Sequence, residues 1–104
     1  MQPPDEKPVE AGNDDQRLDR WLWFSRIVKS RTSAAQLVLD GKVRVNRTRI
    51  LKPSHSIRRG DVLTIALRGR IRILKVLRAG QRRGPPLEAK LLYQVLNDPS
   101  RSTP

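Results

Sequence analysis

The sequence has 104 residues, no cysteine, 37% hydrophobic residues and a formal net charge of +12 at pH 7. This length allows one small domain, and the absence of cysteine excludes disulfides and thiolate chemistry. No apolar run approaches the ~20 residues of a membrane-spanning helix. We therefore expect a cytoplasmic protein without a membrane partner.

The positive charge is concentrated in the middle of the chain. Residues 17–59 contain twelve Lys or Arg, and their only acids are Asp19 and Asp40. The first sixteen residues instead carry five acids and one Lys. Such an excess of like charge opposes compaction, so it favours a polyanionic partner such as a nucleic acid.

Both ends of the chain have compositions typical of disordered segments. Residues 1–15 contain three Pro, one Gly and five acids, which predicts a disordered acidic leader. Residues 98–104 are expected to form a disordered tail. The chain between them, residues 16–97, is interpreted as a single domain.

Two short helices are predicted at the start of this domain. Apolar or small residues recur on one helical face of the first, at Leu18, Trp21, Leu22, Ser25 and Val28. Asp14 or Asp15 is placed to cap that helix. Ser30 is the expected N-cap of the second helix and Gly41 its left-handed C-terminal stop.

The period then changes to that of strands. Residues 42–46 alternate polar and apolar side chains, and 46–48 have the composition of a turn. Residues 62–67 and 71–77 predict two further strands, joined by a hairpin turn at Gly69.

The last predicted element is a helix from Leu87, in the sequence LEAKLLYQVL. Leu87, Leu91 and Val95 follow each other at helical spacing, and Pro85 and Pro86 suit a helix start. The expected fold class is therefore α+β: two packed N-terminal helices, a small and mainly antiparallel sheet, and a C-terminal helix.

Some residues allow two interpretations. Trp21 lies on the core face, whereas Trp23 pairs with Ile27 on the opposite face and either packs under residues 71–95 or stacks on a base. Packing is favoured, since a helix that is apolar on two sides is usually covered on both. The loop with Arg82 and Arg83 is either a second nucleic-acid contact or a solvated loop.

Basic residues surround the two helices and the strand that follows, and Arg17, Arg20 and Arg26 are placed on the first helix. They are placed to share one groove that binds phosphates, with bidentate contacts from Arg and point charges from Lys. The candidate RNA-binding residues are Arg17, Arg20, Arg26, Lys29, Arg31, Lys42, Arg44 and Lys52. Asp19 is expected to be structural, paired with Arg26 or a backbone amide. An RNA recognised by its shape fits phosphate contacts better than base-specific reading of DNA does.

A family resemblance rests on the order of short motifs between residues 17 and 61. These are Arg17-Leu18-Asp19, Leu22, Lys29-Ser30-Arg31, Ala35, Gly41-Lys42-Val43, Val45-Asn46, Lys52-Pro53 and Gly60-Asp61. The pattern resembles the RNA-binding domain of the ribosomal small-subunit protein four type, the αL motif. The resemblance implies an αL core over residues 17–61, followed by strands and a helix over 62–97.

A narrower resemblance extends from Arg17 to about Asn97. The strings RLDRWLWFSRIVKSR and RRGPPLEAKLLYQ are similar to a family of ribosome-associated heat-shock proteins, named for a mass of about fifteen kilodaltons. It implies binding to ribosomal RNA on free large subunits that carry a nascent chain on tRNA, and help with their recycling. Members often continue into a long basic C-terminal extension, whereas this sequence stops at Pro104. Asn46-Arg47 also replaces the usual Asn-Gly turn.

Two other functions were weighed. An RNA-modifying enzyme is disfavoured, since the sequence has one histidine, His55, no cysteine, no paired acid–base spacing and no Gly-rich phosphate motif. A general nucleic-acid binder of the nucleoid remains the alternative to ribosome binding. We expect no catalytic residue, metal, cofactor or small-molecule substrate, and a monomer.

Overall fold

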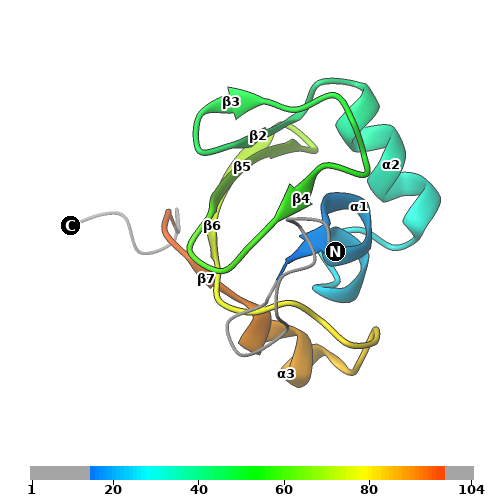
Figure 1. Ribbon diagram of the computed structural model, residues 1–104, viewed down its shortest axis with the longest axis vertical. Helices are drawn as coiled ribbons and strands as arrows, with labels where there is room; N and C mark the ends of the chain where they lie inside the picture. Colours follow the sequence, from blue (N-terminus) through cyan, green and yellow to red (C-terminus); the bar gives the residue numbers. More distant parts are fainter. Residues whose placement is uncertain (1–14, 98–104) are drawn as a thin grey trace, which may run out of the picture.

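The computed structural model describes residues 15–97. It has an α+β architecture, in which helices α1 and α2 pack on one face of a twisted antiparallel sheet (Figure 1). The helices are α1 (Leu18–Phe24), α2 (Arg31–Leu39), α3 (Pro86–Ala89) and the 3₁₀ helix η2 (Lys90–Leu92). The strands are β1 (Gln16–Arg17), β2 (Val43–Val45), β3 (Thr48–Arg49), β4 (Ser56–Ile57), β5 (Val62–Leu67), β6 (Arg70–Val76) and β7 (Tyr93–Val95).

Residues 1–14 and 98–104 lie outside the described part of the chain. The predicted tail, and all of the predicted leader except Asp15, therefore stay predictions, as does a cap by Asp14. Asp15 does not cap α1, because Arg17 occupies the N-cap position and no side chain makes the cap hydrogen bond. The N–H groups of Leu18 and Asp19 donate instead to the carbonyls of His55 and Pro53, which satisfies two of the unpaired donors that begin any helix.

Helix α1 is shorter than its apolar periodicity predicted. All five residues of the predicted face are buried, but the helix ends at Phe24. Ile27 donates its N–H to the carbonyl of Leu22 and Arg26 donates to that of Trp23, with Arg26 at φ 63°. These bonds form the Schellman closure of a helix, in which the left-handed position is usually glycine. The placement of Arg17 and Arg26 within the first helix was therefore wrong: one precedes it and the other follows it.

The predicted limits of α2 are confirmed. The hydroxyl of Ser30 accepts a hydrogen bond from the N–H of Ser33, and Gly41 follows the helix at φ 74°. The fully buried side chains of Ala34 and Val38 join the core shared with α1 and the sheet. The small alanine allows the close approach of α1 and α2 that their short connection requires.

The main sheet has five strands in the order β3-β2-β5-β6-β7, and β1 pairs separately with β4. Strand β5 has the predicted limits, and β6 begins and ends one residue before its prediction. Two-residue turns with positive φ join β2 to β3, at Asn46-Arg47, and β5 to β6, at Arg68-Gly69. Such mirror-image turns match the twist of a hairpin, and Arg47 adopts the conformation that glycine would adopt more easily. Thr48, predicted in the turn, begins β3 instead.

The predicted C-terminal helix is confirmed only as far as Leu92 and is wrong from Tyr93 onward. Helix α3 has four residues, η2 adds three, and the chain then pairs with the edge of β6 as β7. Leu87 and Leu91 of the predicted apolar stripe are 79% and 56% exposed, whereas Ala89 and Leu92 are buried. Pairing along β6 satisfies the backbone of Tyr93–Val95 and packs Tyr93 edge-on against Trp21, so tertiary contacts override local helix propensity.

The segment between β6 and α3 is fastened to α1. The side-chain amide of Gln16 exchanges two hydrogen bonds of 2.9 Å with the backbone of Gly80, and Nε1 of Trp21 donates to the carbonyl of Arg78 at 3.0 Å. Trp21 is fully buried at the centre of this contact. The C-terminal segment and α1 therefore form one packed unit.

The packing interpretation of Trp23 is confirmed only in part: Arg83 covers the ring, but Trp23 is half-buried and does not belong to the core. Its ring lies 5.4 Å from that of Phe24, and the guanidinium of Arg83 lies over it at 5.8 Å. Arg83 also donates to the carbonyls of Trp23 and Val28, while Arg82 pairs with Glu88 at 2.7 Å. Arg83 is thus a structural residue that covers the second apolar face of α1.

Candidate nucleic-acid interface

A buried carboxylate organises the basic residues beside the two helices. Asp19 accepts hydrogen bonds from Nε and Nη2 of Arg17, both at 3.0 Å, and Nη2 of Arg31 lies 4.0 Å from the same carboxylate. The side chain of Asp19 is 7% exposed, against 50% for Arg17 and 43% for Arg31. The acid therefore holds one side of the Arg17 guanidinium by hydrogen bonds and attracts the Arg31 guanidinium, and both guanidiniums remain about half in solvent. Asp19 is structural as expected, but its partners are Arg17 and Arg31, not Arg26.

The hydrogen bonds and the charge of Asp19 raise the pKa of Arg17 above its ordinary value. Arg17 is thus charged at every physiological pH. Its exposed N–H groups are free to meet a second anion, such as a phosphate, in the bidentate geometry that guanidinium favours.

The outer surface of β2 carries a second basic cluster. Arg44 is exposed there and lies directly opposite Arg49 of β3 on one side and Thr64 of β5 on the other. Lys42, two residues before Arg44, is exposed on the same face. Like charges placed directly opposite each other destabilise a sheet. The Arg44–Arg49 pair is therefore better explained by binding of an anionic ligand than by a contribution to folding stability.

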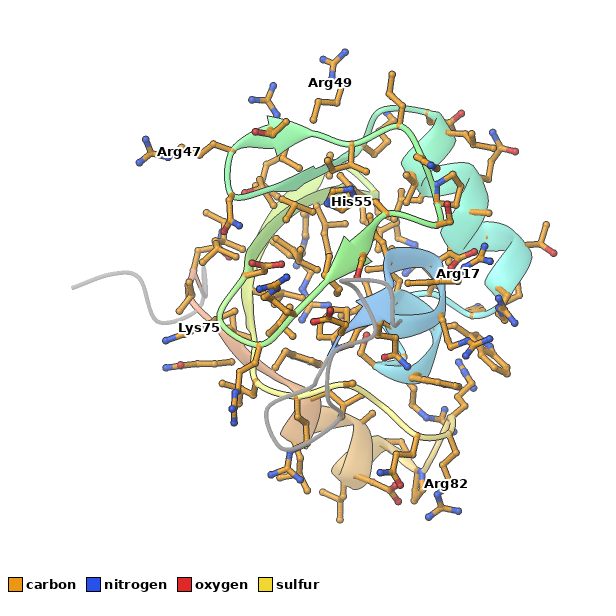
Figure 2. The ribbon with its side chains drawn as sticks, in the orientation of Figure 1. Arg17, Arg47, Arg49, His55, Lys75 and Arg82 are labelled. Atoms are coloured by element: carbon orange, nitrogen blue, oxygen red, sulfur yellow. The ribbon has the colours of Figure 1, made fainter. Side chains whose placement is uncertain are left out.

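One loop connects the two clusters. At the end of β3 the chain lies beside the C-terminal end of α2. Gly41 and the Arg49 side chain are neighbours there, since a Cβ atom on Gly41 would lie 3.5 Å from Cδ of Arg49. The chain then reaches the start of α1 through the hydrogen bond from Asp19 N–H to the Pro53 carbonyl. Lys52 is exposed in this loop. Figure 2 shows Arg17 beside α1 and α2, while Arg47 and Arg49 project into solvent at the β2–β3 hairpin.

We call these residues the primary basic surface, defined as Arg17, Arg31, Lys42, Arg44, Arg49 and Lys52. The structure presents them as two clusters on either side of the loop. Arg49 was not among the predicted site residues, although its place opposite Arg44 follows from the hairpin register.

The other predicted site residues lie elsewhere. Arg20 is exposed on α1, whereas Arg26 turns toward the C-terminal segment, where its Nε donates to the carbonyl of Gly84 at 2.6 Å. Lys29 lines a small cavity of about 150 Å³ together with Ser33 and Arg68. Arg26 and Lys29 therefore border the side of the molecule that holds the β5–β6 hairpin.

Two kinds of feature are absent from residues 15–97. No group of three or more His, Cys, Asp or Glu side chains is arranged there to hold a metal ion. In the same stretch, no helix is long and apolar enough to cross a membrane.

Comparison with known families and curated proteins gives three kinds of match. Residues 16–63 match the S4 domain. The chain is 39% identical over 79 residues to the heat shock protein 15 homolog of Haemophilus influenzae, and 37% identical over 78 residues to heat shock protein 15 of Escherichia coli K12. These alignments span 75% of this chain but only 59% and 58% of the two relatives. A Listeria innocua protein named RQC P-site tRNA stabilizing factor is 30% identical over 82 residues, which are 79% of this chain and 87% of that protein.

A solved structure has the same fold. The heat shock protein 15 of Vibrio cholerae, described as trimeric, superposes with a TM-score of 0.74 at 33% identity. The match covers 78% of this chain and 81% of that one. The likeness therefore includes most of residues 15–97 and extends beyond the part that matches the S4 domain.

Proposed function

The chain belongs to the heat shock protein 15 family of S4-domain proteins, and we propose that it is a non-enzymatic protein that binds structured ribosomal RNA. In this proposal the primary basic surface holds the phosphates of a folded RNA.

One observation carries this proposal: two half-exposed guanidiniums, those of Arg17 and Arg31, meet at one buried carboxylate. Because hydrogen bonds to Asp19 fix the orientation of Arg17 before a ligand arrives, and the same carboxylate attracts Arg31, less side-chain entropy is lost on binding. Phosphate contacts of this kind set position and affinity without reading bases, which suits recognition of RNA by its shape.

The proposed partner is the free large ribosomal subunit that carries a nascent chain on tRNA, and the proposed role is its recycling under heat stress. The names of the relatives support this choice, since one family is named for heat shock and one relative for stabilizing P-site tRNA. We place the protein in the cytoplasm on the same basis.

Sedimentation tests the partner. Lysate containing the full chain is run through a gradient at moderate salt, and we expect it to comigrate with free large subunits. Six or more phosphate contacts predict that affinity falls by roughly 10³–10⁵ between 50 and 200 mM salt. Retention at the top of the gradient would contradict ribosome binding, and binding that is insensitive to salt would contradict the electrostatic mechanism.

A pair of matched variants tests the surface. Lys42→Gln with Arg44→Gln removes two exposed charges from the primary basic surface. Lys75→Gln with Lys90→Gln removes two exposed charges from β6 and η2, and Figure 2 shows Lys75 away from Arg17. We expect the first pair to weaken RNA binding at least about tenfold and to reduce the salt slope by roughly two, and the second to change neither. Equal losses in both would mean that net charge alone governs binding.

Duplex DNA decides the main alternative. If it displaces ribosomal RNA at equal nucleotide concentration, the protein is a general nucleic-acid binder. Chemical turnover of any RNA by the purified protein would identify it as an enzyme.

The oligomeric state is a separate part of the proposal. We expect a monomer, whereas the solved relative is described as trimeric. Analytical ultracentrifugation with and without RNA distinguishes the two.

A further inference from the structure

A second basic concavity lies at the β5–β6 hairpin, apart from the primary basic surface. It is a cavity of about 680 Å³, which we call the hairpin cleft. Four arginines line it: Arg26, Arg68, Arg70 and Arg72. None of the described residues along its walls is acidic, so the cleft has no internal counterion from those walls.

Two of these arginines are fixed from behind. Arg26 donates to the carbonyl of Gly84, and the guanidinium of Arg72 lies over the ring of Tyr93 at 6.0 Å. Arg68 and Arg70 are exposed at the end of the hairpin. Two guanidiniums of the cleft are therefore held in position, and the other two lie at its rim. Four positive charges in one cleft attract anions, and the repulsion between the arginines keeps the cleft open.

The backbone gives an independent indication. Arg26 and Arg68 both have positive φ, 63° and 53°. Glycine and asparagine adopt this backbone conformation at a lower cost in free energy than arginine does. Arginine at two such positions, both with side chains on one cavity, is unfavourable for the fold alone. Outliers of this kind concentrate at functional sites.

The walls between the arginines are apolar. Ile27 and Leu67 line the cleft, and Ile71 and Val95 are 50% and 39% exposed there. An inorganic anion would leave these side chains in water. A nucleotide would use both features, because its phosphate meets guanidiniums while its base lies against apolar side chains and guanidinium planes. The volume is within the range of small-ligand sites, roughly 300–1,000 Å³.

The cleft also leads back to the helices. The smaller cavity of about 150 Å³ shares Ile27, Leu67 and Arg68 with it and adds Lys29 and Ser33 at the junction of α1 and α2. A strand that leaves the primary basic surface near Arg31 can therefore follow Lys29 and Arg68 into the cleft.

We propose that the hairpin cleft binds an unpaired nucleotide of the RNA strand that continues from the duplex held by the primary basic surface. This inference rests on the proposed function, because it takes RNA as the partner. It adds a second site, specific for unpaired RNA, on a different part of the chain.

The test compares two RNAs on the full chain. One is a blunt hairpin RNA, and the other is the same hairpin with a short unpaired extension at one end, tried at either end. We expect the extension to raise affinity about tenfold, from added phosphate contacts and burial of one base. No gain from an extension at either end would overturn the proposal, while binding of the blunt hairpin would leave the proposed function intact.

The matched variants locate the effect. Arg68→Asn with Arg70→Gln removes two charges from the cleft and gives an asparagine–glycine turn, which is well suited to this hairpin, so folding is preserved. We expect this pair to lose the tenfold gain and keep blunt-hairpin binding. Lys75→Gln with Lys90→Gln should keep both. A full gain in the cleft variant would overturn the proposal.

Two further measurements separate failure modes. The isolated single strand is titrated against both chains, and weaker binding to the Arg68→Asn, Arg70→Gln pair supports the cleft even if the blunt hairpin does not bind at all. An acidic peptide is titrated as a competitor. If the peptide displaces the extension while the single strand alone fails to bind, the cleft is a protein-binding site and the proposal is wrong.

Discussion

In the primary basic surface, Arg17 and Arg31 meet a buried carboxylate, whereas the hairpin cleft has four arginines and no acid along its described walls. The contacts of Arg17 and Arg31 with Asp19 lie within residues 17–31, so they form when α1 and α2 pack together. The hairpin cleft is assembled from the end of α1, the β5–β6 hairpin and the strand β7. One basic region is thus ordered by a local counterion, and the other by the long-range packing of the C-terminal segment.

Trp21 connects the two regions, so its removal is expected to damage both. Trp21→Ala deletes a fully buried ring and its hydrogen bond to the Arg78 carbonyl. We expect the free energy of unfolding to fall by about 3–5 kcal/mol, measured by urea denaturation. The affinity for the blunt hairpin RNA and the gain in affinity from an unpaired extension should both decrease. A variant that keeps full stability would show that the C-terminal segment is not fastened through this residue.

Asp19→Asn is expected to affect the primary basic surface alone. It removes the buried charge that orients Arg17 and Arg31, at a cost of about 1–3 kcal/mol in unfolding free energy. Net charge becomes more positive, yet we expect blunt-hairpin affinity to decrease several-fold because the guanidiniums lose their fixed orientation. The gain from an extension should persist. An increase in blunt-hairpin affinity would mean that the amount of charge matters more than its arrangement.

Gly80→Ala is expected to affect the hairpin cleft alone. A Cβ at this position would lie 2.8 Å from Cβ of Phe24 and 3.1 Å from Cδ1 of buried Leu92, so the backbone of 80–84 has to shift, and Arg26 with it. We expect a cost of at least about 1 kcal/mol and a smaller gain from the extension.

Gly84→Ala is the control for that variant. Its Cβ would meet only the carboxyl end of the Glu88 side chain, which can move away at the loss of an exposed pair with Arg82. Exposed pairs of this kind contribute little to stability. If both glycine variants lose equal stability, the contact of Gly80 with Phe24 is not the constraint.

The smallest expected effect is that of pH. The pKa of Arg17 is raised by Asp19, and that of Arg82 by its hydrogen bond and charge pair with Glu88. A raised pKa contributes stability at all pH values below the unfolded-state pKa, and this is lost only as pH rises through the folded-state pKa, far above neutral. RNA affinity should therefore be flat from about pH 6 to about pH 9. A steep change in that range would point to a titrating group outside these pairs.

Local chemistry made several features of the fold predictable. Ser30 and Gly41 marked the ends of α2, alternation marked β2, and the Arg68-Gly69 turn lay between two apolar runs. Each of these depends on backbone preferences of a few neighbouring residues. Part of the candidate site could be proposed for the same reason, since Arg17, Arg31 and Lys42 belong to recognisable short motifs.

Other features depended on distant partners. Arg68, Arg70 and Arg72 alternate along a hairpin, which signals a shared face, but the sequence does not indicate that Arg26 and Val95 complete a cavity there. Arg26 was placed on a helix because its neighbours are periodic, whereas the Schellman closure turns it away.

The sequence by itself determined that this protein is basic, belongs to the α+β class, and has a charged junction between two helices, because composition, caps and periodicity are properties of adjacent residues. Only the tertiary structure decided that residues 93–95 form a strand and that a second arginine cluster encloses a cleft. The physical reason is that pairing with β6 and packing against Trp21 satisfy backbone and side chains together, which outweighs the helix propensity of a short exposed segment.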